Sequence, residues 1–188
     1  MAQAKTLTPA EFEQVLNFIH TRKYALRNRT MFLISHWSGM RVGEIASLRI
    51  RDVLNGDGTV KAEVRLSPEQ TKGRYARTVY WPKKLQTAVA EYIKCRCINS
   101  DNEPVFFTDK AISFSGNSLC QLFFWLYRNA GVAGASSHSG RRSFITNLAS
   151  KGISVRVLAS MAGHRNISTT QAYIDVNDDM KRQAVELI

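Results

Sequence analysis

One short stretch of strand-like alternation interrupts a chain whose hydrophobic pattern is otherwise helical. Apolar side chains recur at every second position from Val60 to Leu66, and a second strand-like run, residues 77–81, follows a loop that contains Pro68. A period of two residues is typical of half-buried strands. We therefore predict a small antiparallel sheet at about residues 53–81, packed against a helical core, with Lys72 on or beside the hairpin turn.

Helical signals account for most of the remaining chain. Thr8 and Glu11 form a capping box around Pro9, and apolar residues then recur at helical spacing, which predicts a helix from about Pro9 to His20. No repeat or long linker divides the sequence, so we expect one α+β, mainly α domain over residues 1–188. Further helices are predicted over residues 31–37 (ended by Ser38-Gly39), 42–48, 82 to about 97 and 118–130, with short helices beginning near Ser139, Ser154, Ser168 and Asn177.

Composition narrows the class of partner without identifying it. The 188 residues are 44% hydrophobic, which supports one well-buried core, and the formal net charge of +11 favours a polyanion such as DNA, RNA or an anionic membrane. No apolar run approaches the roughly 20 residues that cross a bilayer, and the N-terminus lacks an apolar signal region, so we expect a cytoplasmic protein. Three cysteines without zinc-type spacing are interpreted as reduced thiols, and we expect no metal site.

A set of basic and phenolic side chains suits attack on a phosphodiester. Arg41 and Arg141 are guanidiniums, which bind phosphate oxygens and remain charged at any working pH. A nucleophile such as the Tyr173 phenol must lose its proton, and a nearby imidazole can accept it. The departing sugar oxygen needs an acid, and a lysine among guanidiniums, Lys72, fits that role. The imidazoles close to these groups in sequence are His138 and His164.

Four stretches that carry these residues resemble the sequence boxes of the tyrosine recombinases, the phage integrase family. They are residues 38–45 (SGMRVGEI), 71–74 (TKGR), 138–141 (HSGR) and 163–173 (GHRNISTTQAY). They occur in the family's order, and the resemblance extends from about Leu7 to the C-terminus. Each box alone is weak, whereas the four together are highly specific.

The resemblance implies a function and a role for each residue. The chain would be the catalytic domain of a site-specific DNA recombinase that cleaves and rejoins DNA without metal or other cofactor. Arg41 and Arg141 would clamp the scissile phosphate, Lys72 would be the general acid, and Tyr173 would form a covalent 3′-phosphotyrosyl bond. His138 and His164 would assist proton transfer and phosphate binding, and Glu44 would support the catalytic residues. The side chains expected to contact DNA are Arg74, Arg77, Arg142 and Arg165.

Three further expectations follow from the same resemblance. Family members act as tetramers on double-stranded DNA, with accessory DNA-bending proteins as further partners. A separate N-terminal DNA-binding domain usually completes them, and this chain begins almost directly at the catalytic portion, so it is either a fragment or a minimal form. Many members have a second histidine where this chain has Arg142, whose position after Arg141 favours a structural role or a contact with the DNA backbone.

Simpler interpretations and two other functions stay open at the level of sequence. Arg41 and Glu44, three residues apart, form only a solvated ion pair in most helices. Residues 157–170 resemble a helix-turn-helix, as in a DNA-binding regulator without enzymatic activity, although the turn is long for that motif. A type IB topoisomerase would use similar chemistry to relax supercoils. The regulator leaves Lys72, His138 and Arg141 unexplained.

Overall fold

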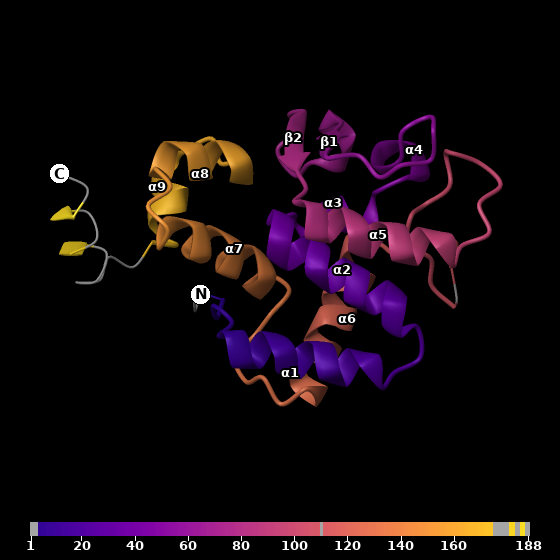
Figure 1. Ribbon diagram of the computed structural model, residues 1–188, viewed down its shortest axis with the longest axis horizontal. Coiled ribbons are helices and arrows are strands. Elements are labelled where there is room, and N and C mark those ends of the chain that lie inside the picture. Colours follow the sequence, from indigo (N-terminus) through magenta and orange to yellow (C-terminus); the bar gives the residue numbers. More distant parts are fainter. Residues whose placement is uncertain (1–3, 110, 175–180, 183–184, 187–188) are drawn as a thin grey trace.

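A two-stranded antiparallel sheet lies against one side of a helical body (Figure 1). The computed structural model describes residues 4–109, 111–174, 181–182 and 185–186. Strand β1 (Glu63–Leu66) pairs with β2 (Arg77–Tyr80), so that Leu66 faces Arg77 across the ladder. Exposed and buried residues alternate along β1, which confirms the predicted small sheet. Lys72 lies in the loop between the strands, as predicted, just after the 3₁₀ turn Pro68–Gln70.

The helices follow the predicted order, with different lengths at several places. The helix near Asn177 falls outside the described residues. The turn Ile50–Val53 was not predicted, because four residues are too few to show a period. The observed helices are α1 (Pro9–His20), α2 (Ala25–Ser38), α3 (Val42–Ala46), α4 (Ile50–Val53), α5 (Lys83–Lys94), α6 (Gly116–Asn129), α7 (Ser139–Ala149), α8 (Val155–Ala162) and α9 (Ile167–Gln171).

Helix α2 corrects the sequence analysis, because it begins at Ala25 and not at Met31. Its first turns carry polar residues that are buried all the same. Arg27 donates to the carbonyl oxygen of Phe107 at 2.8 Å and to Asn28 Oδ1 at 3.0 Å. These hydrogen bonds compensate the buried Arg27 and Asn28 side chains for the loss of hydrogen bonds to water. Hydrophobic periodicity cannot detect a helix start whose inward residues are polar.

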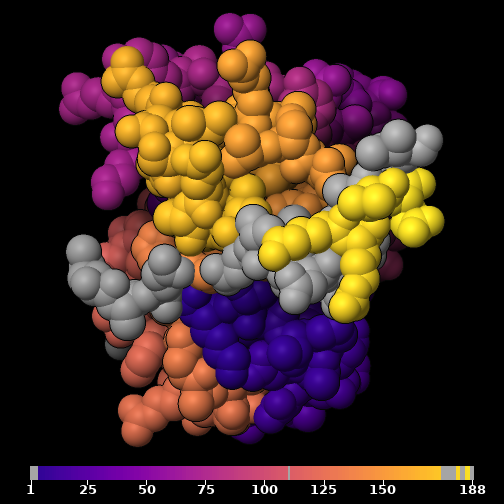
Figure 2. Space-filling view, turned by 90° about the vertical axis from the view of Figure 1, so that its left-hand side faces the viewer, coloured from indigo at the N-terminus to yellow at the C-terminus, as the bar shows by residue number. Residues whose placement is uncertain are grey.

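Two hydrophobic clusters divide the described structure. The larger one is formed by α1, α2, α3, α5, α6 and the sheet. The smaller one contains Ile145, Ala149, Leu158 and Ala162 from α7 and α8, with Tyr173 packed against it. Figure 2 shows this end of the molecule, with α8 and α9 above α1. The candidate site lies where the two clusters meet.

Helices α2 and α7 join the two clusters by a close approach. A Cβ atom on Gly140 of α7 would overlap the Ser35 side chain of α2. Gly39, which ends α2 as predicted, has φ +65°, and a Cβ there would come within 2.5 Å of the Phe144 ring. Both positions therefore need glycine, and together they set Arg141 directly beside the end of α2.

Candidate active site

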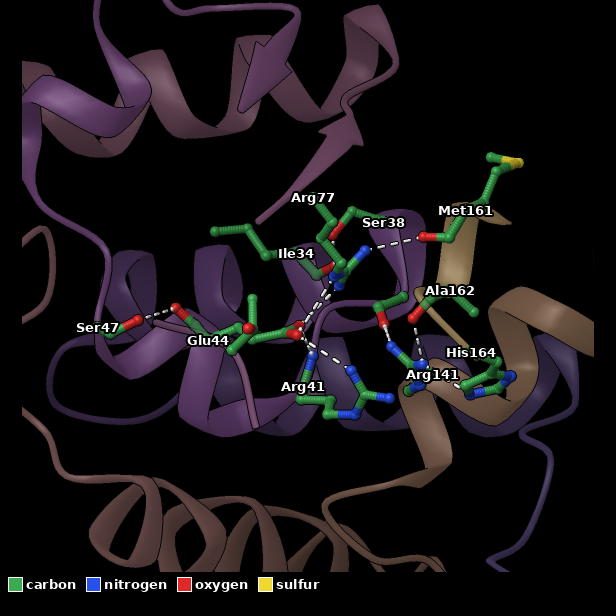
Figure 3. Close-up of polar contacts among 12 residues, drawn as sticks. Ile34, Ser38, Arg41, Glu44, Ser47, Arg77, Arg141, Met161, Ala162 and His164 are labelled. Atoms are coloured by element: carbon green, nitrogen blue, oxygen red, sulfur yellow. Dashed lines mark hydrogen bonds and ion pairs between the residues drawn. The ribbon is translucent and has the colours of Figure 1, made fainter. Parts of the chain in front are cut away.

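Arg141 is the most enclosed arginine of the site. Its side chain lies in the first turn of α7 and the residue is 3% exposed. Nη1 donates to the Gly39 carbonyl oxygen at 2.7 Å, and Nη2 lies 2.6 Å from the Ala162 carbonyl oxygen and 2.8 Å from His164 Nε2 (Figure 3). These bonds occupy three of the five guanidinium N–H groups, which leaves two for a phosphate oxygen. Burial lowers the pKa of Arg141 to about 9, so the group keeps its charge at neutral pH.

His164 is held in one tautomer by its neighbours. Because Arg141 can only donate, Nε2 of His164 must accept, and Nδ1 therefore donates to Thr170 Oγ1 at 2.9 Å. Burial, followed by the charge of Arg141, lowers the pKa of His164 to about 4. The ring is therefore neutral at pH 7. It stacks on the Tyr173 ring, with 5.7 Å between centroids and 22° between planes.

One buried carboxylate organises two arginines. Glu44 is 1% exposed and accepts from the backbone N–H of Arg41 at 2.8 Å, from Arg41 Nη1 at 3.1 Å and from Arg77 Nη2 at 2.7 Å (Figure 3). The first of these bonds caps α3 and fixes the backbone of Arg41, whose side chain remains 26% exposed. Four guanidinium N–H groups of Arg41 are thus left to face a ligand, since only one bonds Glu44.

Arg77 belongs to the scaffold in this structure, where the sequence predicted a DNA contact. Its side chain is 10% exposed. Nε and Nη2 donate to Glu44, and Nη1 donates to the Met161 carbonyl oxygen at 2.8 Å. A Cβ on Gly163 would lie 2.6 Å from the Cδ atom of Arg77. Arg77 therefore connects β2, α3 and the end of α8, and its guanidinium nitrogens are already engaged.

Lys72 shares a pocket of about 470 Å³ with Arg41 and His164. The loop that carries it is fastened at its base, since Thr71 Oγ1 donates to the Tyr75 carbonyl oxygen at 2.9 Å. Arg165, from the turn after α8, lies over the ring of Tyr75 in this loop, at 4.0 Å from its centroid. The loop thus holds an exposed lysine at the edge of the arginine cluster.

Tyr173 and His138 line a second pocket, of about 490 Å³. His138 precedes α7 and is exposed, while burial of part of its ring and then the charges of Arg141 and Arg41 lower its pKa. Tyr173 follows α9, where its carbonyl oxygen accepts from Thr146 Oγ1 at 3.0 Å. The fold therefore brings together all six predicted catalytic side chains at the junction of the two clusters.

The predicted DNA contacts separate into exposed and enclosed residues. Arg74 and Arg165 are exposed beside the Lys72 pocket. Arg142, in contrast, is 8% exposed and lies against Thr6 and the Tyr173 ring. Sequence reasoning missed Thr170, which is fully buried behind His164. No periodic signal marks Thr170, because the contact depends on how α9 folds back.

Two other features of the described chain concern ligands and membranes. Among the residues placed by the structure, there is no group of three or more His, Cys, Asp or Glu side chains able to hold a metal ion. None of the helices in this part of the chain has the length and apolar character needed to cross a bilayer. Independence from metals stays a prediction.

The sequence matches the phage integrase family over residues 5–180, so the chain belongs to that family. A relative is the tyrosine recombinase XerA of Pyrococcus furiosus, 28% identical over 186 residues, which are 97% of this chain and 61% of that protein. The chain spans about three fifths of the length of the curated relatives it matches.

Solved structures support the same assignment of the fold. A crystal structure of XerA recombinase superposes with a TM-score of 0.78 at 20% identity and covers 100% of this chain and 66% of that one. The site-specific recombinase XerH, bound to a palindromic difH substrate in a post-cleavage complex, has a TM-score of 0.71 at 21% identity, over 96% and 51% of the two chains. The mainly helical fold with its small sheet is therefore the integrase fold.

Proposed function

We propose that this chain is the catalytic part of a site-specific DNA recombinase, which cleaves double-stranded DNA and rejoins it through a bond to Tyr173. The observation that carries the proposal is the meeting of Arg41, Arg141 and His164 beside Tyr173, with Lys72 at the edge of the cluster. Family membership supports it, as does the difH substrate to which the XerH recombinase is bound. A DNA substrate is consistent with a cytoplasmic protein.

The arginines supply charge where the reaction creates it. Attack on a phosphodiester places negative charge on the non-bridging oxygens. Arg41 and Arg141 retain unused N–H groups, and Glu44 and the backbone carbonyls hold both guanidiniums in place before the substrate arrives. Fixed donors need no reorganisation during the reaction, which is the main advantage of such an arrangement.

Proton transfer assigns different tasks to the two histidines. The Tyr173 oxygen attacks phosphorus, its proton must leave, and a 3′-phosphotyrosyl bond forms while the 5′ oxygen departs. His138 lines the Tyr173 pocket and its lowered pKa keeps it neutral at pH 7, so we assign it the proton. Both ring nitrogens of His164 already take part in hydrogen bonds. We therefore assign His164 the role of holding Arg141 and stacking on the Tyr173 ring, and not that of accepting the proton. Lys72 protonates the departing 5′ oxygen.

DNA would lie across the face that carries Arg74 and Arg165. Both side chains are exposed beside the Lys72 loop, and the formal net charge of +11 favours a polyanion. We assign phosphate contacts to these two residues, and we assign neither Arg77 nor Arg142 to the DNA. Because the chain belongs to this family, we also propose that it assembles into a tetramer on DNA, with accessory DNA-bending proteins as further partners.

A covalent trap tests the proposal. A suicide duplex, nicked so that the cleaved end diffuses away, should leave the unaltered protein covalently attached to DNA. Tyr173→Phe removes only the attacking oxygen, so adducts should vanish while DNA affinity stays unchanged. Tyr80→Phe is the matched control, because Tyr80 is 53% exposed on β2. Adducts from Tyr173→Phe would show that another residue is the nucleophile.

The same experiment separates the other functions. A regulator without enzymatic activity gives no adduct from any variant. It also needs a recognition helix, whereas α9 comprises only five residues, Ile167–Gln171. A topoisomerase gives adducts but relaxes supercoiled plasmid without exchanging ends between duplexes. Joining of two differently labelled duplexes by the unaltered protein is the result that we expect.

A further inference from the structure

Arg142 contacts the ring of the proposed nucleophile, Tyr173, and is the neighbour in sequence of Arg141 in the phosphate clamp. It follows Arg141 on α7, so the two side chains leave the helix about 100° apart. The Arg142 guanidinium carbon lies 5.5 Å from the centroid of the Tyr173 ring, within the range in which a cation is attracted by an aromatic ring. His164 stacks on the same ring. The phenol is therefore contacted by a guanidinium and an imidazole.

The other end of this contact is the N-terminal segment, residues 4–8. Arg142 Nε donates to Thr6 Oγ1 at 3.1 Å. The neighbouring Leu7 is 4% exposed, and its backbone N–H donates to Ser143 Oγ at 2.8 Å. Thr8 then caps α1. Because Leu7 and Thr8 are both fixed, Thr6 offers Arg142 a stationary acceptor. The segment before α1 begins near the N label in Figure 1.

We propose that Arg142 is a positioning residue that holds the Tyr173 ring against His164 and couples the nucleophile to residues 4–8 through Thr6. The inference rests on the proposed role of Tyr173 in cleavage. It differs from a DNA contact, because Arg142 is 8% exposed and its Nε bonds the protein itself. A misplacement of about 1 Å can slow a reaction by about 10²-fold, so a second fixed contact on the ring should raise the cleavage rate.

The substitution Arg142→Met tests the contact between Arg142 and the Tyr173 ring, because methionine is of similar length but carries no charge. Arg22→Met is the matched control, because Arg22 also lies over an aromatic ring, Phe18, at 4.4 Å, and its loss changes the net charge equally. We expect Arg142→Met to form the adduct with the suicide substrate about tenfold more slowly than the unaltered protein, because one desolvated cation–π contact is lost. Arg22→Met should form the adduct at the normal rate. Arg142→Lys should recover part of the rate.

DNA affinity distinguishes positioning from phosphate binding. We expect Arg142→Met and Arg22→Met to bind duplex equally at each salt concentration. If Arg142→Met alone bound more weakly, with the slope of log affinity against log salt reduced by about one, Arg142 would be a phosphate contact and the inference would be overturned. Equal adduct rates for the two variants would overturn it as well.

The coupling to the N-terminal segment has its own test. Thr6→Val keeps the shape of the side chain and removes the oxygen that accepts from Arg142. It should slow adduct formation in the unaltered background and have no further effect in Arg142→Met. Independent effects that simply add would refute the link through Thr6. Thr6→Val also keeps the proposal testable if Arg142→Met does not fold.

A readout without catalysis separates this inference from the proposed function. In protein labelled with fluorotyrosine, the Tyr173 resonance is the one that Tyr173→Phe deletes. It should shift in Arg142→Met and in Thr6→Val but not in Arg22→Met. If the unaltered protein formed no adduct, the proposed function would fail while the resonances still decided the contact. A Tyr173 resonance that did not move in either variant would overturn the inference.

Discussion

Glu44→Gln should destabilise the protein and release two arginines that one carboxylate holds. Glu44 is 1% exposed and accepts from Arg77 Nη2 at 2.7 Å and from Arg41 Nη1 at 3.1 Å. Removing one partner of a buried ion pair costs about 3–5 kcal/mol. Gln keeps the shape and one acceptor oxygen, so we expect the lower value of about 3 kcal/mol, which lowers the melting temperature of a chain of this size by about 6–12 °C.

The matched control is the same substitution in an exposed ion pair. Glu91 lies 3.2 Å from Arg29, and their side chains are 51% and 40% exposed. Such pairs contribute about 0–1 kcal/mol, so Glu91→Gln should melt close to the unaltered protein. Circular dichroism during heating measures both variants, and adduct formation measures the loss of Arg41 placement. If the two variants lost equal stability, the role given to the Glu44 carboxylate would be refuted.

The stability that Glu44 provides should also depend on pH with a definite sign. Burial by itself raises the pKa of Glu44, but the hydrogen bond and charge of Arg77, and then those of Arg41, outweigh burial and lower the pKa below its ordinary value of 4.5. The contribution is therefore fully present above pH 4.5 and is lost as the pH falls through the lower pKa of the folded state. The difference in unfolding free energy between the unaltered protein and Glu44→Gln should shrink on acidification, and a widening difference would contradict this assignment.

Two further predictions concern the turn after α8 and the proposed acid. Gly152→Ala and Gly163→Ala both place a side chain at positive φ, but only the second meets Arg77, at 2.6 Å, so thermal melting should show about 1 kcal/mol of destabilisation for the first and about 1–3 kcal/mol more for the second. Lys72→Ala should slow cleavage by about 10²–10⁴-fold, and a substrate with 5′-bridging sulfur, a better leaving group, should restore much of that rate. The same substrate should not rescue Arg41→Ala, which acts on the non-bridging oxygens, and equal rescue of both variants would contradict the two roles.

Local signals in the sequence predicted the elements but not all of their limits. The capping box of Thr8 and Glu11 gave α1 from Pro9 to His20, because both partners lie within one turn. Helix α2 began earlier than predicted, since its first inward residues are polar and depend on the distant Phe107 carbonyl oxygen. Hydrophobic periodicity therefore does not predict the start of a helix whose buried residues are polar and are satisfied by long-range hydrogen bonds.

The candidate catalytic residues were predicted by chemistry and by resemblance, whereas their supports came from the fold. Thr170, six residues after His164, fixes the histidine tautomer only because α9 folds back beside α8. Thr6 lies 136 residues from Arg142, and no pattern in either segment indicates the hydrogen bond between them. A contact across that distance depends on the docking of the N-terminal segment on α7.

Arg77 shows how a physical signal in the sequence can be overlooked. Alternation along residues 77–81 places Arg77 on the same face of β2 as Val79 and Trp81, which are 2% and 3% exposed. A charge on an inward face needs a charged or hydrogen-bonding partner, so its strand position predicts a partner within the protein. Its partners, Glu44 and the Met161 carbonyl oxygen, lie 33 and 84 residues away. The strand pattern could thus have shown that Arg77 is inward, but only the complete fold shows that it joins the clamp to the turn that carries His164.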